Sequence, residues 1–363
     1  MNIEKSKNPA PRVIAWEITR RCVLACKHCR GSARDMSYDG ELNTGECFKT
    51  IDSIASFCKP ILILTGGEPM TRPDIYDIAS YAVERGLRVV LAPCGHLITS
   101  QTARRLKDSG VSAISISIDG ATVREHDEFR GVSGAYESAM EGLRHAIEAG
   151  IPFQINTTVS RQNADSLPAI LEKAVELGAK TLDLFFLVPT GRAAALRDLE
   201  ISAAKHEELL NWVYDSDRDS PIRVKTTCAP HYARIQHTRR IAERSKETGT
   251  ALRNSNVAHP ASAGCMAGQG FVFISHTGIL QPCGFLDIAC GDLRTVDYDF
   301  KQLYLESQVF KNLRDVRTYH GKCGVCEFRR LCGGCRARAY AHSGDYLGEE
   351  PMCAYIPVAS SVL

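Results

Sequence analysis

VIAWEITRRCVLACKHCRGSAR, residues 13–34, contains Cys22, Cys26 and Cys29 in the spacing C-x3-C-x2-C. A strand-like run precedes the cysteines, and a short polar loop carries them. A cubane iron–sulfur cluster usually takes four cysteine thiolates, so three thiolates leave one iron open to a small molecule. A zinc site is the alternative, but such a site ordinarily has four donors, and no fourth donor is near in the sequence. The stretch therefore predicts an iron–sulfur cluster with one exchangeable position.

Length and charge narrow the class of protein. The chain of 363 residues is long enough for one large α/β domain and a smaller module. Its formal net charge of +2 gives no global attraction to nucleic acid or to an anionic membrane. No apolar run approaches the roughly 20 residues that span a bilayer, and the segment MNIEKSKNPAP lacks the apolar part of a signal peptide. We expect a cytoplasmic protein that binds neither nucleic acid nor membranes.

Cysteine is unusually frequent for a chain with no export signal. Of the 15 cysteines, three lie at 22–29 and eight lie between 265 and 353. Metal or cluster ligation explains such clustering better than disulfides do in a cytosolic protein. Cys47 and Cys58 fall in or beside a predicted helix and are expected in the core, while Cys94 and Cys228 remain scattered and unassigned.

Strand-like and helix-like segments alternate through the first two thirds of the chain. Strands are expected at 13–17, 61–64, 88–92, 113–118, 153–157 and 181–186, and helices at 44–57, 74–85, 100–109, 135–149, 164–177 and 205–215. This order implies parallel strands with right-handed crossovers. Six units fall short of the eight of a closed barrel, so we expect an α/β fold, a partial (βα)6 TIM-like barrel. Its site should lie at the carboxyl ends of the strands.

Changes in composition and periodicity along the sequence divide the chain into four parts. We expect a disordered arm at 1–12, the barrel at 13–220, a bridging region and linker at 221–263, and a cysteine-rich module at 264–363. The bridging region includes a basic helix-like run, and the module begins with a β-hairpin around His276-Thr277-Gly278.

Two polar motifs follow expected strands. Gly66-Gly67-Glu68-Pro69 comes directly after ILIL, and its glycines, which lack Cβ, allow a ligand to approach the backbone closely. Ser117 and Asp119 fall on one side of a later strand, at its carboxyl end.

Together with the cysteine triad, these motifs resemble the radical S-adenosylmethionine (SAM) superfamily. The resemblance implies that Cys22, Cys26 and Cys29 hold a [4Fe-4S] cluster whose open iron binds SAM. It further implies that the Gly66–Pro69 motif binds the SAM amino group, that Ser117 and Arg130 contact polar groups of SAM, and that Asn156 and Val188 lie near the ribose and the adenine. The implied SAM-binding residues are Gly66, Gly67, Glu68, Pro69, Ser117, Asp119, Arg130, Asn156 and Val188. A surface ion pair for Arg130 and a turn-capping role for Asn156 remain alternatives, and His28 stands where the family often has a stacking aromatic residue.

The C-terminal cysteines resemble the SPASM extension of this superfamily, which carries auxiliary iron–sulfur clusters. The resemblance implies one cluster on Cys265, Cys283, Cys290 and Cys335, and another on Cys323, Cys326, Cys332 and Cys353. Two residues rather than the usual three separate Cys332 from Cys335, so the choice between one and two auxiliary clusters stays open. A zinc ribbon is the alternative, because four thiolates suit both metals.

Along residues 10–357 the chain is similar to the heme b synthases, porphyrin-modifying members of the superfamily. Ala15-Trp16-Glu17, Lys27-His28-Cys29-Arg30 and the segment 331–340 carry this likeness. The resemblance implies that a 5′-deoxyadenosyl radical starts the oxidative decarboxylation of two propionates of iron-coproporphyrin III, giving the vinyls of heme b. A low-potential electron donor such as flavodoxin or ferredoxin would be needed.

Basic side chains should bind the substrate carboxylates, because arginine pairs with them in a bidentate manner. The candidates are Arg192, Arg223, Lys225, Arg234, Arg336 and Arg338, with His231 as a candidate ligand of the substrate iron. The alternatives are a sister tetrapyrrole enzyme, the didecarboxysiroheme deacetylase, and a peptide-modifying SPASM enzyme. A non-catalytic iron–sulfur electron carrier is a further alternative, in which the Gly66–Pro69 and Ser117–Asp119 motifs would have no purpose.

Overall fold

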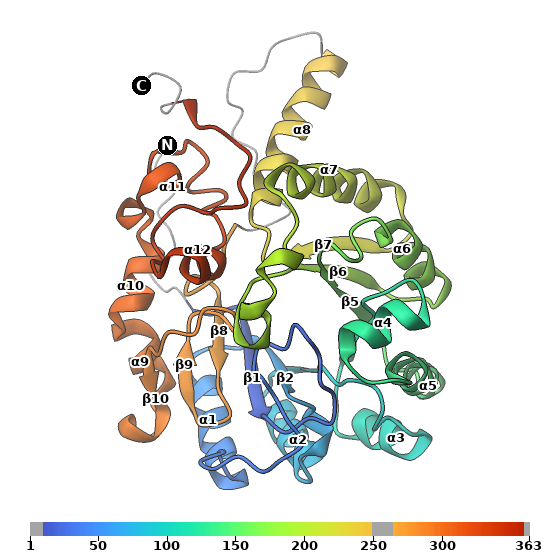
Figure 1. Ribbon diagram of the computed structural model, residues 1–363. Helices are drawn as coiled ribbons and strands as arrows, with labels where there is room; N and C mark the ends of the chain where they lie inside the picture. Colours follow the sequence, from blue (N-terminus) through green and yellow to red (C-terminus); the bar gives the residue numbers. More distant parts are fainter. Residues whose placement is uncertain (1–9, 249–263, 359–363) are drawn as a thin grey trace.

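The computed structural model describes residues 10–248 and 264–358, so most of the expected arm, and residues 249–263 of the expected bridging region and linker, lie outside these ranges. Ten strands of the described residues form one sheet in the order β10-β9-β8-β1-β2-β3-β4-β5-β6-β7 (Figure 1). The strands are β1 (Val13–Thr19), β2 (Ile61–Gly66), β3 (Arg88–Leu91), β4 (Ala113–Ser117), β5 (Phe153–Val159), β6 (Thr181–Phe186), β7 (Arg223–Thr227), β8 (Phe271–Ile274), β9 (Ile279–Gln281) and β10 (Gly291–Asp292).

Neighbouring strands from β1 to β7 are parallel, as βα units require. Helices connect them: α1 (Thr44–Phe57), α2 (Ile75–Glu84), α3 (Ser100–Asp108), α4 (Val123–Arg130), α5 (Ala135–Glu148), α6 (Leu167–Glu176), α7 (Ala203–Asp219) and α8 (His231–Thr248). The apolar residues of the strands, such as Ile14, Leu64 and Ile116, are fully buried in one core with the inner faces of the helices. The expected α/β partial barrel is confirmed.

Helix α4 is an element that the sequence analysis did not predict. Its eight residues contain few apolar side chains, so the helical period is weak. The stronger indication is local: Thr122 and Glu125 form a capping box at its start, and Gly131, with φ of 70°, ends it. This helix places Arg130 beside the cysteine loop.

The C-terminal part extends the barrel sheet. Strand β8 pairs in parallel with β1, on the edge of β1 that β2 leaves free. Strands β8 and β9 form the expected antiparallel hairpin, and the short helices α9 (Phe300–Glu306), α10 (Gln308–Arg314), α11 (Gly321–Val325) and α12 (Arg336–Ser343) follow. The β8–β9 hairpin thus joins the C-terminal part to the first strand of the barrel (Figure 1).

None of the helices in the described residues combines the length and the apolar character needed to cross a bilayer.

Candidate active site

The loop after β1 carries the three cysteines at the carboxyl edge of the sheet. A hydrogen bond from the Cys22 amide to the Arg34 carbonyl, 3.0 Å long, closes the loop. Backbone N–H groups of Leu24 and Ala33 lie 3.4 Å from the sulfurs of Cys22 and Cys29, respectively. Donors of this kind stabilise thiolates, which are the form that binds iron.

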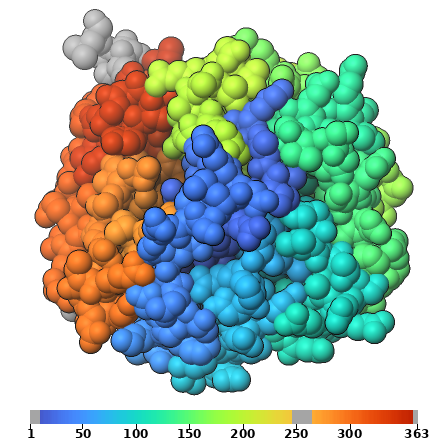
Figure 2. Space-filling model, turned by 60° about the horizontal axis from the view of Figure 1, so that its bottom comes forward, coloured from blue at the N-terminus to red at the C-terminus, as the bar shows by residue number. Residues whose placement is uncertain are grey.

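The three cysteines line one cavity of about 170 Å³. Its wall also includes residues at the carboxyl ends of β2, β5 and β6 and in the loops that follow β2, β3 and β6: Gly66, Gly67, Cys94, Thr158, Phe185, Phe186, Leu187, Val188 and Arg192. Much of the rest of the cavity wall is formed by His28, Arg30, Arg130 and Phe285. On the face drawn in Figure 2, the N-terminal segment (blue) lies between C-terminal segments (orange) and segments from the middle of the chain (green). Parts far apart in the sequence therefore meet around the cysteine loop.

The backbone at the start of the cysteine loop passes so close to Gly66 and Gly67 that it leaves no room for a Cβ at either position. A Cβ on Gly66 would lie 2.2 Å from the Thr19 carbonyl oxygen, and one on Gly67 would lie 2.4 Å from the Arg21 carbonyl oxygen. The amides of Gly67 and Glu68 donate to these same two carbonyls. The motif thus fixes the start of the cysteine loop, and its two glycines, but not Glu68 or Pro69, line the cavity.

Replacing Gly66 with alanine is expected to lower the free energy of unfolding by about 1–3 kcal/mol, because a backbone oxygen cannot move aside. Iron content should fall with it, since the cysteine loop shifts. Gly45→Ala is the matched control, because Gly45 lies in the first turn of α1, where alanine fits. Thermal unfolding measures both variants, and a Gly66→Ala protein as stable as the parent would contradict the packing argument.

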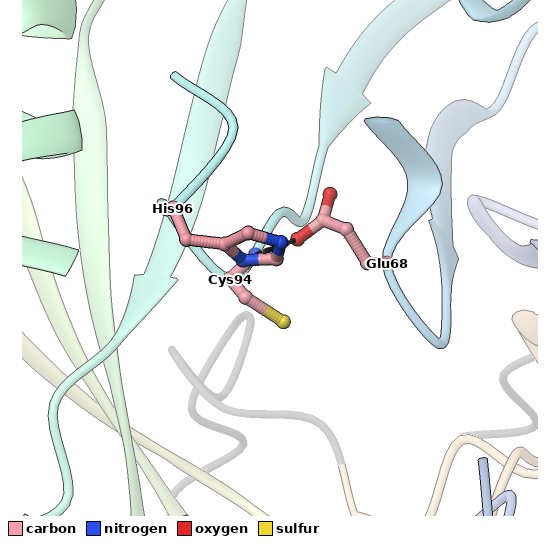
Figure 3. Close-up of side chains that lie close together, drawn as sticks. All are labelled: Glu68, Cys94 and His96. Carbon is pink, nitrogen blue, oxygen red and sulfur yellow. Dashed lines mark hydrogen bonds and ion pairs between the residues drawn. The ribbon is translucent and has the colours of Figure 1, made fainter. Parts of the chain in front are cut away.

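Glu68 is fully buried and its carboxylate is already engaged (Figure 3). It accepts hydrogen bonds from the amides of Met70 (2.9 Å) and Cys94 (2.5 Å), and the His96 ring lies 3.9 Å away. The Glu68 carboxylate, the Cys94 thiol and the His96 ring form a group with metal-ligand chemistry. The Cys94 sulfur lies 4.0 Å from that of Cys22. Cys94 has no role assigned from the sequence, although its position just after β3 is the position of a site residue.

Arg130 and Asp119 form a buried ion pair at the cavity, with 2.5 Å between Nη2 and the carboxylate. Burial raises the pKa of Asp119, but the charge of Arg130, together with His28, His126 and the Thr158 amide, lowers the pKa overall. The Arg130 guanidinium also lies 3.7 Å from the Cys26 sulfur. Arg130 lines the cavity, and Asp119 holds it there while accepting a further bond from the Thr158 amide.

Other expected SAM contacts fall in different places. Val188 lines the cavity, whereas Ser117 and Asn156 pair side by side on β4 and β5 and are not among its lining residues. The Asn156 side chain accepts a hydrogen bond from Gln154. His28 stacks on Phe129, with ring centroids 4.1 Å apart, and burial lowers its pKa to about 3. The His28 ring is therefore neutral at physiological pH.

Of the six basic substrate candidates, Arg192 alone is among the residues that line this cavity. Its guanidinium donates to the carbonyls of Cys26 and Ala33, and its Nη2 atom is buried without a hydrogen-bond partner among the described residues. Arg223 and Lys225 are exposed and pair with Asp217 and Asp183. Arg336 and Arg338 are buried in α12 of the C-terminal part, and Arg234 is buried in α8, where it pairs with Glu207.

Seven of the eight C-terminal cysteines separate into two groups, and Cys290 packs in the main core. One group, called the outer group, consists of Cys323, Cys326, Cys332 and Cys353. It lines a second cavity together with His231 and Arg234. Amides of Glu350, Phe328 and Gly334 lie 3.4 Å from the sulfurs of Cys323, Cys326 and Cys332. His231 thus faces the outer group and is absent from the lining of the cavity that holds Cys22.

Cys335 is directed away from the outer group. Gly333 and Gly334 stand between Cys332 and Cys335 with φ of 72° and 64°, a left-handed pair that only glycine adopts easily. Cys335 instead belongs to a buried cluster against which Cys228, Cys265 and Cys283 pack. The short two-residue spacing therefore sends neighbouring cysteines to different groups.

Comparisons with known proteins agree with this geometry. A sequence profile of the radical SAM superfamily matches residues 16–174. The chain is 48% identical to the AdoMet-dependent heme synthase of Nitratidesulfovibrio vulgaris over 96% of its own length and 94% of the relative's. It is 46% identical to the enzyme of the same name from Methanosarcina barkeri, over 96% and 97% of the two chains. The crystal structure of Streptococcus suis SuiB bound to S-adenosylmethionine has the same fold, with a TM-score of 0.74, 16% identity, and coverage of 95% of this chain and 77% of SuiB.

The barrel, the three-cysteine cavity and these likenesses define a radical SAM enzyme with a cysteine-rich, SPASM-like C-terminus. The chain belongs to the family of AdoMet-dependent heme synthases. The family implies a [4Fe-4S] cluster and SAM as cofactors, and the chemistry of the cavity fits them: three thiols with N–H donors, a glycine-lined wall and an arginine beside the sulfurs.

Proposed function

We propose that the protein converts iron-coproporphyrin III into heme b by oxidative decarboxylation of two propionates. The observation that carries the proposal is the near-full-length identity of 48% to an AdoMet-dependent heme synthase. Removal of a hydrogen atom from the β-carbon of a propionate, followed by loss of CO2 and one electron, leaves a vinyl group. When bound, the cluster and SAM supply the carbon radical that makes such a hydrogen removable.

The residues of this chain divide the remaining tasks. Cys22, Cys26 and Cys29 would hold the cluster, and Gly66, Gly67 and Val188 would contact SAM from the cavity wall. Arg130, held by Asp119, would pair with the SAM carboxylate.

Charge at the cavity supports a substrate that carries carboxylates. Arg30 and Arg192 line the cavity, and the unpartnered Nη2 of Arg192 suits an anionic oxygen. Arg30 is held 3.0 Å from the buried Glu17 and over the ring of Phe273. Burial raises the pKa of Glu17, but the charge of Arg30 and the Arg20 hydrogen bond lower it overall, so Glu17 stays ionised and holds Arg30.

We also propose that the C-terminal cysteines hold two auxiliary clusters, one of which accepts the electron released at each decarboxylation. A low-potential donor such as flavodoxin or ferredoxin would reduce the SAM-binding cluster. Anaerobically reconstituted protein should then contain about seven to twelve iron atoms per chain, and stoichiometric zinc without iron would contradict the proposal.

The reaction of a sister tetrapyrrole enzyme is the second candidate function, because two other relatives are named as synthases of different tetrapyrroles. The chain is 28% identical to the Fe-coproporphyrin III synthase of Methanosarcina barkeri and 29% identical to the pre-heme d1 synthase of Dinoroseobacter shibae. These identities are well below 48%, which favours the heme synthase reaction.

A substrate assay tests the proposal. Reduced protein, SAM and iron-coproporphyrin III should give heme b, with mass spectrometry showing the loss of two formic-acid equivalents and release of CO2. Didecarboxysiroheme is the comparison substrate, and it should remain unchanged. Modification of didecarboxysiroheme, with iron-coproporphyrin III left intact, would overturn the proposal in favour of the sister enzyme.

A further inference from the structure

Cys228 occupies a strained position at the end of the last parallel strand. It follows β7 directly, and its φ of 60° is a left-handed conformation that disfavours residues with a Cβ. Its carbonyl is fixed by a 3.1 Å hydrogen bond from the buried Arg338. Strain of this kind persists where surrounding structure imposes it, and it often accompanies functional positions.

The thiol of Cys228 lies among cysteines of the C-terminal part. It is hydrogen-bonded to the thiol of Cys335 and interacts electrostatically with Cys283. Cys283 in turn interacts with both Cys265 and Cys335, and Cys265 interacts with Cys335. Five of the six possible pairs among these four side chains are therefore in interaction range.

N–H donors reach the sulfurs of this group, as they do in the Cys22–Cys26–Cys29 triad and in the outer group. The Phe285 amide lies 3.5 Å from the Cys283 sulfur. Backbone amides of Arg336 and Ala267 donate to Cys265, and the amide of Arg338 donates to Cys335. Such donors are typical of thiolates that bind metal, because they offset the charge of the sulfurs.

Cys290, which the sequence analysis grouped with Cys265, Cys283 and Cys335, lies elsewhere. It packs in the main core beside β10, and its side chain interacts with the Ile288 carbonyl at 3.7 Å and with Ser307. No other cysteine contributes to its electrostatic environment among the described residues.

We infer that Cys228, Cys265, Cys283 and Cys335 are the four thiolate ligands of the inner auxiliary iron–sulfur cluster, and that Cys290 is not a ligand. The inference rests on the auxiliary clusters of the proposed function and names the ligands of one of them. Cys228 comes from the barrel and the other three from the C-terminal part, so the cluster joins the two covalently. Val188 and Phe285 border both this group and the cavity of Cys22, Cys26 and Cys29, which places the inner group just behind the wall of the active site.

Cys228→Gly is the decisive variant, because glycine adopts a φ of 60° without strain while lacking the thiol. Cys290→Ala is its matched control, a buried cysteine also replaced by a small residue. After anaerobic reconstitution, Cys228→Gly should contain about one to four fewer iron atoms per chain than the parent. The electron paramagnetic resonance spectrum of one auxiliary cluster should change or disappear, and Cys290→Ala should match the parent in both measurements.

Circular dichroism and thermal unfolding of the apo-proteins show whether each variant folds. If Cys290→Ala loses iron and Cys228→Gly does not, or if Cys228→Gly keeps the iron content and spectrum of the parent, the inference is overturned. The measurement uses no tetrapyrrole, so a failed substrate assay and a failed ligand assignment are distinguishable.

Discussion

Cys29→Ala is expected to reduce SAM cleavage by about a thousandfold or more, equivalent to about 4 kcal/mol of barrier. Cys29 lines the cavity with Cys22 and Cys26, and its sulfur accepts a hydrogen bond from the Ala33 amide. Two thiolates hold a cubane poorly, so the variant should lack about four iron atoms per chain. Methionine and 5′-deoxyadenosine, measured by chromatography after chemical reduction, report the cleavage.

Cys58→Ala is the control for this result. Cys58 is the cap residue at the end of α1 and packs against the main core, remote from the cysteine cavities. Its replacement should leave iron content and SAM cleavage close to those of the parent. If Cys29→Ala retained full iron and normal cleavage, the SAM-binding cluster would have to be held by other residues, and the Cys94 thiol, 4.0 Å from Cys22, would be the first to replace.

Cys326→Ala is expected to separate SAM cleavage from product formation. Heme b formation should fall on the order of a hundredfold while 5′-deoxyadenosine formation changes little, because the variant would lose the proposed electron acceptor and would keep Cys22, Cys26 and Cys29. Cys326 lines the outer cavity, and the Cys22 cavity is lined by other residues. Both products are measured in one reaction with iron-coproporphyrin III, SAM and a reductant.

Two other outcomes would count against this role of the outer group. Heme b formation at the rate of the parent would show that the electron leaves by another path. Loss of SAM cleavage together with heme b formation would indicate that the outer group supports the fold of the barrel. The Cys58→Ala protein again serves as the comparison, because the thiol that it lacks belongs to none of the three cysteine groups.

Much of the architecture could be predicted because it follows from local patterns. The limits of α1 and β6 agree with the sequence at both ends, since Asn43 forms a capping box and apolar residues define the strand. Helix α4 was missed because its capping box accompanies few apolar side chains. The addition of β8 to the edge of β1 joins residues about 260 positions apart, and no periodicity reports such pairing.

The candidate site divides in the same way. The sequence by itself determined that Cys22, Cys26 and Cys29 lie together, because three cysteines in one short loop are close whatever the fold does. Tertiary structure alone decided that Arg192, of the six basic candidates, borders the cavity, that His231 faces the outer cysteines, and that Cys228 joins Cys335. The physical reason is that these contacts depend on how strands, helices and the two left-handed glycines Gly333 and Gly334 orient the chain, and spacing along the sequence does not record that orientation.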